Sequence, residues 1–250
     1  MQDLLDLIHQ RHSERTPCDS HRLVSPQALE QILEAASWAP TAHNMQNFEI
    51  IVVDDPATLQ AIGVIPTRTS PVFLRENSRQ LSASVEELRR RGTGVFAGMF
   101  PPEWRNPDAD FEAIAVAEPP TPLSHSLQNA PCLLLVLYDT RKRAPASEGD
   151  VLGFISLGCV MENMWLTAQA FGLGLQILSV FSSEAVEAAL RTMLGFPAHL
   201  KIAYACRLGH PAETHDYVRV RRPREAFVHR NRYGGRDQTE FKSQLPGDAR

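Results

Sequence analysis

The sequence lacks the short motifs that carry hydrolytic, metal-dependent and nucleoside-triphosphate chemistry. HExxH, GxSxG and GxxxxGK[ST] do not occur, and no cluster of cysteine and histidine has the spacing of metal ligands. The four cysteines lie far apart without a CxxC pair, and three of them stand in apolar runs. We therefore expect no metal site and interpret the cysteines as reduced core thiols of a cytoplasmic protein.

Long apolar runs and an excess of positive charge are also missing. No segment approaches about 18 uninterrupted apolar residues, and the N-terminal stretch contains acidic groups and no apolar run of signal-peptide type. The net charge is −4, whereas proteins that bind nucleic acid usually carry a strong basic surplus. We expect neither a membrane anchor nor a nucleic-acid partner.

The chain does have the composition of a globular protein, and its periodicity marks many elements. Apolar residues make up 43% of 250 residues, enough for a sizeable core, and we expect one domain over residues 1–250. Apolar and capping patterns predict helices at 4–10, 26–39, 56–62, 77–91, 151–171 and 184–193, and strands at 48–53, 132–138, 175–181 and 200–208. Their alternation alone suggests a parallel sheet.

Residues 92–124 are broken by six prolines and are the hardest part of the chain to assign to helices or strands. Such a segment is either a lid over a site or a surface insertion, and we favour a mobile cover. It begins with GTGVFAG, which is close to a dinucleotide-binding fingerprint, but the third glycine comes one residue late and a helix precedes it where a strand should be. We expect residues 235–250 to form a flexible tail.

Arginines alternate with other residues near both ends of the chain. Arg11, Ser13 and Arg15 follow the first helix, and Arg219 and Arg221 lie in an arginine-rich C-terminal segment. Alternate side chains of an extended segment share a face, so each set could grip one phosphate. The alternatives are a solvated loop after a helix for the first set and a basic surface tail for the second.

A third polar cluster lies in the loop PTAHNMQ, residues 40–46, between a helix end and a strand. Its hydroxyl, amide and imidazole groups could hydrogen-bond the polar edge of a heteroaromatic ring. The alternative is turn chemistry, in which Thr41 and Asn44 satisfy their own backbone. His43 is the one titratable residue of this loop and our single candidate for a proton donor.

Taken in order, six segments resemble the FMN-dependent nitroreductase family. They are RHSER, APTAHNMQNFEIIVV, NAPCLLLVLYD, MENMWLTAQAFGLGLQILSVF, IAYACRLGHP and VRVRRPREAFVHRNRYG, and together they span residues 11–234. The resemblance implies an α+β fold, with a central, mostly antiparallel sheet flanked by helices, rather than the parallel sheet that alternation suggests. It also implies an interlocked homodimer with two FMN sites at the subunit interface.

The resemblance further implies which residues hold FMN. The N-terminal arginine set would hold the phosphate, ribityl chain and pyrimidine edge, the C-terminal set would close on the phosphate, and the polar loop would reach the flavin from the second subunit. A strand would present backbone groups along the ring. The implied cofactor-binding residues are Arg11, His12, Ser13, Arg15, Pro40, Thr41, Ala42, Asn44, Gln46, Leu178, Ser179, Val180, Arg219 and Arg221.

The activity that the resemblance implies is a ping-pong oxidoreductase reaction. NAD(P)H would reduce the flavin, and a nitroaromatic, quinone or related small acceptor would then take the electrons in the same pocket. Two alternatives stay open. One is a flavoenzyme of the same fold with a dedicated substrate, for dehalogenation, heterocycle oxidation or flavin breakdown, and the other is a non-catalytic flavin-binding protein.

The sequence departs from the family pattern at two places. Asn47 and Phe48 stand where the family usually has Pro-Trp, which alters the stiffness of the polar loop. No Asn and Lys pair for the pyrimidine edge of the flavin is identified, and Asn77 and Gln80 are the remaining candidates. A lysine near N1 would stabilise reduced anionic flavin, so its absence bears on the preferred electron acceptor.

Overall fold

The computed structural model describes residues 4–213, 215 and 217–235, which form two compact units. The first unit is built from the chain up to residue 68 and from 119 to 217, and the second from residues 69–118 and the chain from 218 onward. The lid expected at 92–124 divides between them, because residues 119–124 belong to the first unit. Apart from residue 235, the tail expected at 235–250 lies outside the described residues. The single domain over the whole chain stays a prediction.

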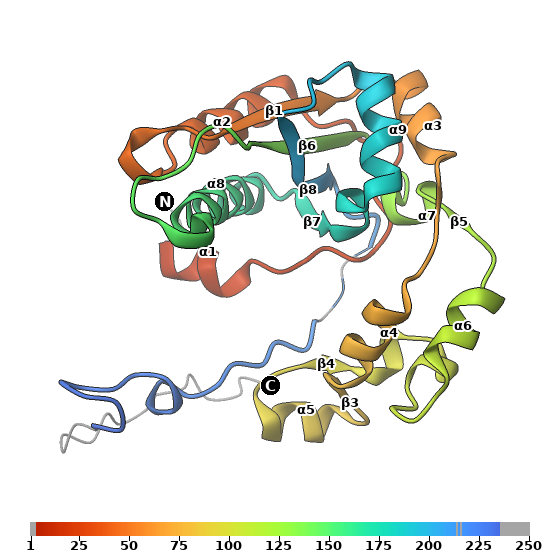
Figure 1. Cartoon of the computed structure of the whole chain (residues 1–250), viewed down its shortest axis with the longest axis vertical. Coiled ribbons are helices and arrows are strands. Elements are labelled where there is room, and N and C mark those ends of the chain that lie inside the picture. The colour runs from red at the N-terminus through yellow and green to blue at the C-terminus, as the bar shows by residue number, and fades with distance from the viewer. Residues whose placement is uncertain (1–3, 214, 216, 236–250) are drawn as a thin grey trace. The chain divides into compact units, whose positions relative to one another are not determined.

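A four-stranded sheet forms the centre of the first unit (Figure 1). Its strands are β1 (Phe48–Val53), β6 (Cys132–Asp139), β8 (Leu200–Gly209) and β7 (Gly174–Leu178), in the spatial order β1-β6-β8-β7. All three pairings are antiparallel, which confirms the sheet that the family resemblance implies and corrects the parallel sheet that alternation suggests. Strand β7 lies at the edge of the sheet, so one side of β7 pairs with β8 and its other side pairs with no strand of this sheet.

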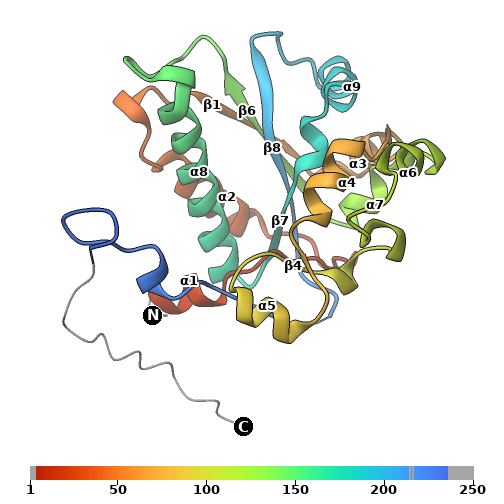
Figure 2. The same ribbon diagram turned by 60° about the horizontal axis from the view of Figure 1, so that its bottom comes forward.

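Helices cover both faces of this sheet (Figure 2). On one face, α2 (Pro26–Ser37) and α8 (Val151–Ala170) pack against inward side chains of β6 such as Leu134 and Val136. Side chains of β6 on the other face pack with Ile62, Leu127 and Leu190 from three further helices. These are α3 (Pro56–Gly63), α7 (Ser124–Leu127) and α9 (Glu184–Leu194). Coverage on both faces is why β6 is apolar at almost every position.

The remaining elements of the first unit are short. Helix α1 (Leu4–Gln10) lies beside α8, and β2 (Pro66–Thr67) pairs antiparallel with β5 (Thr121–Pro122). Three 3₁₀ turns complete the unit: η1 (Ala42–Asn44), η4 (Glu148–Asp150) and η5 (Ser179–Ser182). The strand expected at 175–181 is therefore too long, because the chain leaves β7 after Leu178 and turns into η5.

The second unit contains the short helices α4 (Pro71–Ser78), α5 (Val85–Arg91) and α6 (Phe111–Ala117). Between them lie β3 (Leu81–Ser82) and β4 (Val95–Phe96), which pair in parallel, and the turns η2 (Ala97–Met99) and η3 (Pro102–Trp104). The turn η6 (Arg224–Ala226) lies in the C-terminal segment. Leu74, Phe111 and Ala115 form a small core of their own.

The single helix expected at 77–91 is wrong, and local capping explains why. Ser84 begins α5 by accepting a hydrogen bond from the Glu87 amide at 3.1 Å, and the Glu87 carboxylate accepts one from the Ala83 amide at 2.7 Å. This reciprocal capping box starts a new helix inside the apolar stripe. Gly92, with φ of 63°, then ends α5 as a left-handed C-cap. The first glycine of the GTG stretch therefore ends a helix, whereas a dinucleotide-binding fingerprint would begin one.

Helix α8 is long and strongly apolar. Residues 148–170 form one helical stretch of the described chain that is long and apolar enough to cross a membrane by length and composition. In the apolar 18-residue window of that stretch 39% is buried, and Leu157, Val160 and Met164 lie in the main core against the sheet. A core helix passes the same length test, and these contacts are those of a core helix.

Candidate functional site

The arginine segment, residues 11–16, runs beside the free edge of β7. The Glu14 amide donates a hydrogen bond to the Leu175 carbonyl at 3.1 Å. Glu14 and Thr16 point inward and are only 4% and 6% exposed, whereas Arg15 is exposed and Ser13 half-buried. Ser13 and Arg15 therefore lie on the outer side of the segment, alternating with the inward side chains of Glu14 and Thr16.

Buried side chains from distant parts of the first unit hold this segment. The Trp165 indole N–H donates to the His12 carbonyl at 3.1 Å. The Arg207 guanidinium is 1% exposed and donates to the carbonyls of Glu14 at 2.9 Å and Thr16 at 3.0 Å. It also donates to Gln176 Oε1 at 2.8 Å. Burial opposes the charged form and lowers the pKa of Arg207, and these acceptors compensate for the lost water.

Arg207 and Trp165 were missed as site residues by sequence reasoning. Arg207 lies inside the apolar strand sequence IAYACRLG, and a charged residue in such a strand is rarely buried without partners. That signal was available, although it does not reveal which segment the guanidinium binds.

The side chain of Arg11 is held against α8. Its guanidinium carbon lies 4.5 Å from the centre of the Trp165 ring, a cation–π geometry, and its Nε lies 3.5 Å from Glu162 Oε1. This approach to Glu162 is an ion pair but not a hydrogen bond, since Arg11 Nε is a buried donor without a hydrogen-bond partner. A buried donor of this kind is well suited to an anionic acceptor supplied by a ligand.

Glu14 is a buried carboxylate in the middle of the arginine segment. It accepts hydrogen bonds from the Thr16 amide at 2.9 Å and from the Thr16 and Tyr217 hydroxyls, both at 2.5 Å. Burial alone would raise the pKa of Glu14, but these bonds and a longer one from His12 together hold it below its ordinary value. The His12 ring lies 4.4 Å from the Tyr217 ring, so it faces this network.

The amide loop, residues 40–47, is shaped mainly by its own backbone. His43, Asn44 and Gln46 all have positive φ, at 51°, 51° and 44°. The Thr41 hydroxyl oxygen accepts from the Gln46 amide at 3.1 Å, and the Gln46 side chain donates to Asn44 Oδ1 at 2.9 Å. The turn chemistry considered for this loop is thus present at Thr41, whereas Asn44 bonds the Gln46 side chain, and His43 and Asn44 are exposed.

Two anchors tie the amide loop to neighbouring elements. The Ala42 amide donates to Ser156 Oγ on α8 at 3.0 Å, and Lys142 Nζ donates to the Gln46 carbonyl at 3.1 Å. Asn47, at the position where the family usually has proline, is fully buried and donates to the Gly153 carbonyl at 3.3 Å. Ser156 and Lys142 were not identified from the sequence. Neither has a motif around it, and only the fold brings them to the loop.

The structure does not bring the amide loop and the arginine segment together within one chain. They attach to α8 at Ser156 and Trp165, nine positions apart, which is about 14 Å along a helix axis. Of the three backbone positions expected along the flavin ring, Leu178 is buried at the end of β7, while Ser179 and Val180 belong to η5. The Ser179 carbonyl already accepts from Ser182 Oγ at 2.7 Å.

Arg219 and Arg221 belong to the second unit. The Arg221 guanidinium donates to the Val220 carbonyl at 2.8 Å. The backbone there lies against Gly92, because a Cβ at that glycine would stand 3.2 Å from the Arg221 carbonyl oxygen. Asn77 and Gln80, the remaining candidates for the pyrimidine edge, are also in this unit.

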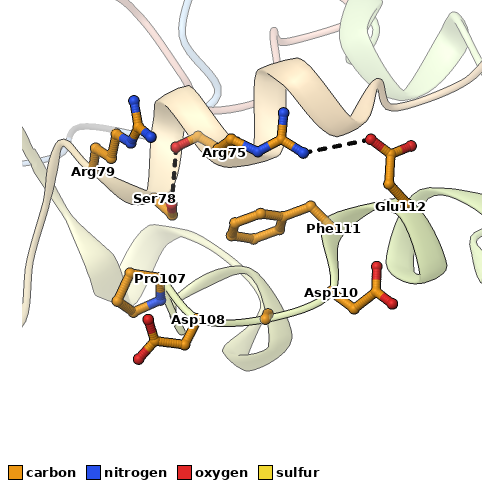
Figure 3. A pocket seen from close by; sticks show the side chains of 9 residues that line it. Arg75, Ser78, Arg79, Pro107, Asp108, Asp110, Phe111 and Glu112 are labelled. Atoms are coloured by element: carbon orange, nitrogen blue, oxygen red, sulfur yellow. Dashed lines mark hydrogen bonds and ion pairs between the residues drawn. The ribbon is translucent and has the colours of Figure 1, made fainter.

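The second unit contains a small open pocket of about 290 Å³ between α4 and the start of α6 (Figure 3). Several of its polar side chains have partners within the protein: Arg75 pairs with Glu112 at 3.4 Å, and Asp110 caps α6 by accepting from the Ala113 amide at 3.0 Å. The buried Phe111 forms its floor and part of the small core. We regard it as a junction between helices rather than a ligand site. Within the described residues no cluster of metal-ligating side chains occurs.

The fold and the arginine segment define an α+β protein whose antiparallel sheet lies between helical layers, with basic side chains along one sheet edge. The chain belongs to the nitroreductase family, because the model of that family matches residues 8–210. It is 31% identical over 205 residues to a protein named NADH dehydrogenase from Thermus thermophilus, covering 80% of this chain and 83% of that protein.

Two solved structures show the same fold. One is a nitroreductase with bound FMN from Bacteroides fragilis, with 18% identity and a TM-score of 0.54, covering 87% of this chain and 92% of that one. The other is a BluB-like flavoprotein from Clostridium difficile 630, with 20% identity and a TM-score of 0.58, covering 91% and 98%.

Proposed function

We propose that this protein is an FMN-dependent oxidoreductase that passes electrons from NAD(P)H to a nitroaromatic, quinone or related small acceptor. Membership of the nitroreductase family supports an oxidoreductase, and the similar protein from Bacteroides fragilis binds FMN. The observation that carries the proposal is the arginine segment, in which the Arg15 guanidinium and the Ser13 hydroxyl lie on the outer side of a backbone fixed by buried partners and the Arg11 guanidinium packs on Trp165. Such a donor set suits a phosphate.

The residues present fit the phosphate end of FMN. Arg11 Nε is a buried donor that forms an ion pair with Glu162 but no hydrogen bond, and Arg15 is exposed beside Ser13, so all three side chains can turn donors toward one anion. Arg219 and Arg221 follow Tyr217 in the chain by two and four residues, and this covalent connection is the ground for including them. We also propose that the backbone of Leu178, Ser179 and Val180 contacts the flavin ring. Leu178 ends β7, and the other two residues lie in the turn η5.

The chemistry that FMN supplies when bound is the transfer of reducing equivalents from NAD(P)H to the acceptor, in two half-reactions of ping-pong order. The chain itself contributes position, charge and hydrogen bonds. Ser13 and the arginines bind and orient, Asn44 and Gln46 offer amide groups to a heteroaromatic edge, and the exposed His43 ring can hold or release a proton.

The protein is proposed to act as a homodimer, in which the amide loop of one subunit completes the site of the other. Within one chain that loop is fixed far along α8 from the arginine segment. Around the loop the first unit exposes large apolar side chains: Trp38 is 79% exposed, and on α8 Phe154 and Ile155 are 55% and 56% exposed. Large apolar side chains exposed in this number are favoured where a protein partner covers them.

The first test is the visible spectrum of the purified protein, followed by chromatography of the cofactor that heat releases. We expect bound FMN near one per subunit. Arg11→Ala should retain less FMN, whereas Arg75→Ala, which removes an arginine from an exposed ion pair of the second unit, should retain as much as the wild type. A colourless protein that does not take up added FMN would refute the proposal.

A second test addresses the acceptor. Rapid oxidation of NADH or NADPH in the presence of a nitroaromatic compound or a quinone, with parallel lines in a double-reciprocal plot, supports the proposed reaction. Slow turnover with every such acceptor, in a protein that binds FMN and is reduced by NAD(P)H, would favour a dedicated substrate. A bound flavin that neither nucleotide reduces would favour a non-catalytic binding protein.

A third test addresses the dimer. Sedimentation should show a dimer for the wild type and a shift toward monomer for Phe154→Glu, because a charge would enter the apolar surface of α8. Val116→Glu is the matched control, since Val116 is 81% exposed on α6 of the second unit. A wild-type monomer that still binds FMN would exclude the shared site.

A further inference from the structure

Tyr217 makes two hydrogen bonds to the arginine segment with one hydroxyl group. It accepts from the Arg15 amide at 3.2 Å and donates to Glu14 Oε1 at 2.5 Å. A tyrosine hydroxyl has one proton to donate, so the donor role is fully used in this pair. The phenol therefore joins the backbone of Arg15 to the inward side chain of Glu14.

Glu14 gathers the remaining bonds of the same network. Its Oε1 also accepts from the amide and the hydroxyl of Thr16, and its Oε2 lies 3.4 Å from His12 Nε2. The carboxylate is thus surrounded by donors although it is almost completely buried. A carboxylate so placed is costly to move, because any displacement would leave a buried charge with fewer donors.

These inward bonds determine where the outward side chains point. Neighbouring side chains of an extended segment lie on opposite sides, so fixing Glu14 and Thr16 inward directs Ser13 and Arg15 outward. Groups that are already positioned lose less freedom when a ligand binds, and affinity rises accordingly. Glu14, Thr16 and Tyr217 can act in this way without touching the ligand themselves.

We propose that Glu14 and Tyr217 form a latch that positions Ser13 and Arg15 for the phosphate of the flavin, with Tyr217 acting as a positioning residue. This inference rests on the proposed function. It predicts a specific pattern of loss: disrupting the latch should weaken binding through the phosphate more than binding through the isoalloxazine ring. Riboflavin, which has the ring and ribityl chain but no phosphate, separates the two contributions.

The experiment compares FMN and riboflavin binding to the flavin-free full-length protein by quenching of flavin fluorescence. Tyr217→Phe keeps the ring beside His12 and removes only the hydroxyl. We expect its Kd for FMN to rise about tenfold, as for one lost hydrogen bond near charged groups, and its Kd for riboflavin to change less than about twofold. Tyr233→Phe is the control, because Tyr233 is 92% exposed and outside the network.

Glu14→Gln is the second variant and keeps the test decisive if Tyr217→Phe does not fold. It preserves the shape of the side chain and one acceptor oxygen, and we expect the same selective loss of FMN. Equal losses for FMN and riboflavin, or wild-type binding of FMN in both variants, would overturn the latch while leaving the flavoenzyme intact. A wild-type protein that binds neither flavin would overturn the proposed function and the latch with it.

Discussion

The arginine segment and the amide loop reach their shapes by opposite means. In the arginine segment, partners lie far away in sequence: Arg207, Trp165 and Tyr217 bond to a backbone that has no positive φ. In the amide loop, three residues adopt left-handed backbone, and the side chains of Thr41 and Gln46 form hydrogen bonds within the loop itself. The first segment is specified by the tertiary fold, and the second stores local backbone strain, which persists only where the surroundings hold it.

The largest effect should follow from removing the buried centre of the first region. Arg207→Leu would leave the carbonyls of Glu14 and Thr16 buried without their donor, so we expect unfolding to become easier by at least about 3 kcal/mol. Urea unfolding of the flavin-free protein measures this. Arg75→Leu, which breaks an exposed ion pair, should cost less than about 1 kcal/mol. Similar costs for both would show that the arginine segment does not depend on Arg207.

Acid should weaken the same region through Glu14. Because its folded-state pKa is lowered, Glu14 contributes stability that is present above its unfolded pKa and is lost as the pH falls through the lower folded value. We therefore expect the stability difference between wild type and Glu14→Gln to be largest near pH 7 and to shrink progressively below the ordinary range of glutamate. Urea unfolding of both proteins from pH 7 to about pH 3 tests this. A difference independent of pH would contradict it.

The amide loop should respond more weakly to loss of a tertiary anchor. Ser156→Ala removes the acceptor of the Ala42 amide, and we expect a cost of about 1 kcal/mol, because a half-buried amide can recover a water partner. FMN retention should fall as well if the loop completes the site of a second subunit. Ser182→Ala, which removes the Ser179 bond in η5, is a comparable serine change in an exposed turn. A cost as large as that of Arg207→Leu would break the contrast between the two regions.

The difference between the two regions also explains what could be predicted from sequence. The predictions were correct for elements with strong local signals: Ser25 caps α2 by accepting from the Ala28 amide at 3.1 Å, and β1 has the predicted bounds. The parallel strand direction suggested by alternation was wrong, because alternation of helices and strands does not encode the long-range pairing of β6 with β8. The break between α4 and α5 was missed because the capping box at Ser84 lies inside a continuous apolar stripe.

The candidate site shows the same limit. Residues 11, 13 and 15 could be singled out because their spacing is visible in the chain, and the structure places Ser13 and Arg15 on the outer side and Arg11 against Trp165. Their supports could not, since Arg207 and Tyr217 are about two hundred positions away and touch this segment only in the folded protein. Left-handed backbone at Gln46 was equally hidden, because glutamine has no preference for that conformation.

The smallest change in stability should come from relaxing the strained loop. Gln46→Gly relieves a positive φ of 44°, while glycine gains freedom in the unfolded chain, so we expect a net change within about 1 kcal/mol. Gln128→Gly is the matched control, because Gln128 has φ of 48° at the end of α7. If Gln46 contributes to the flavin site, only Gln46→Gly should reduce FMN affinity, which fluorescence titration of both variants measures. Unchanged FMN affinity would mean that the left-handed residues of this loop serve the turn alone, because the strain would then have been relieved without any functional loss.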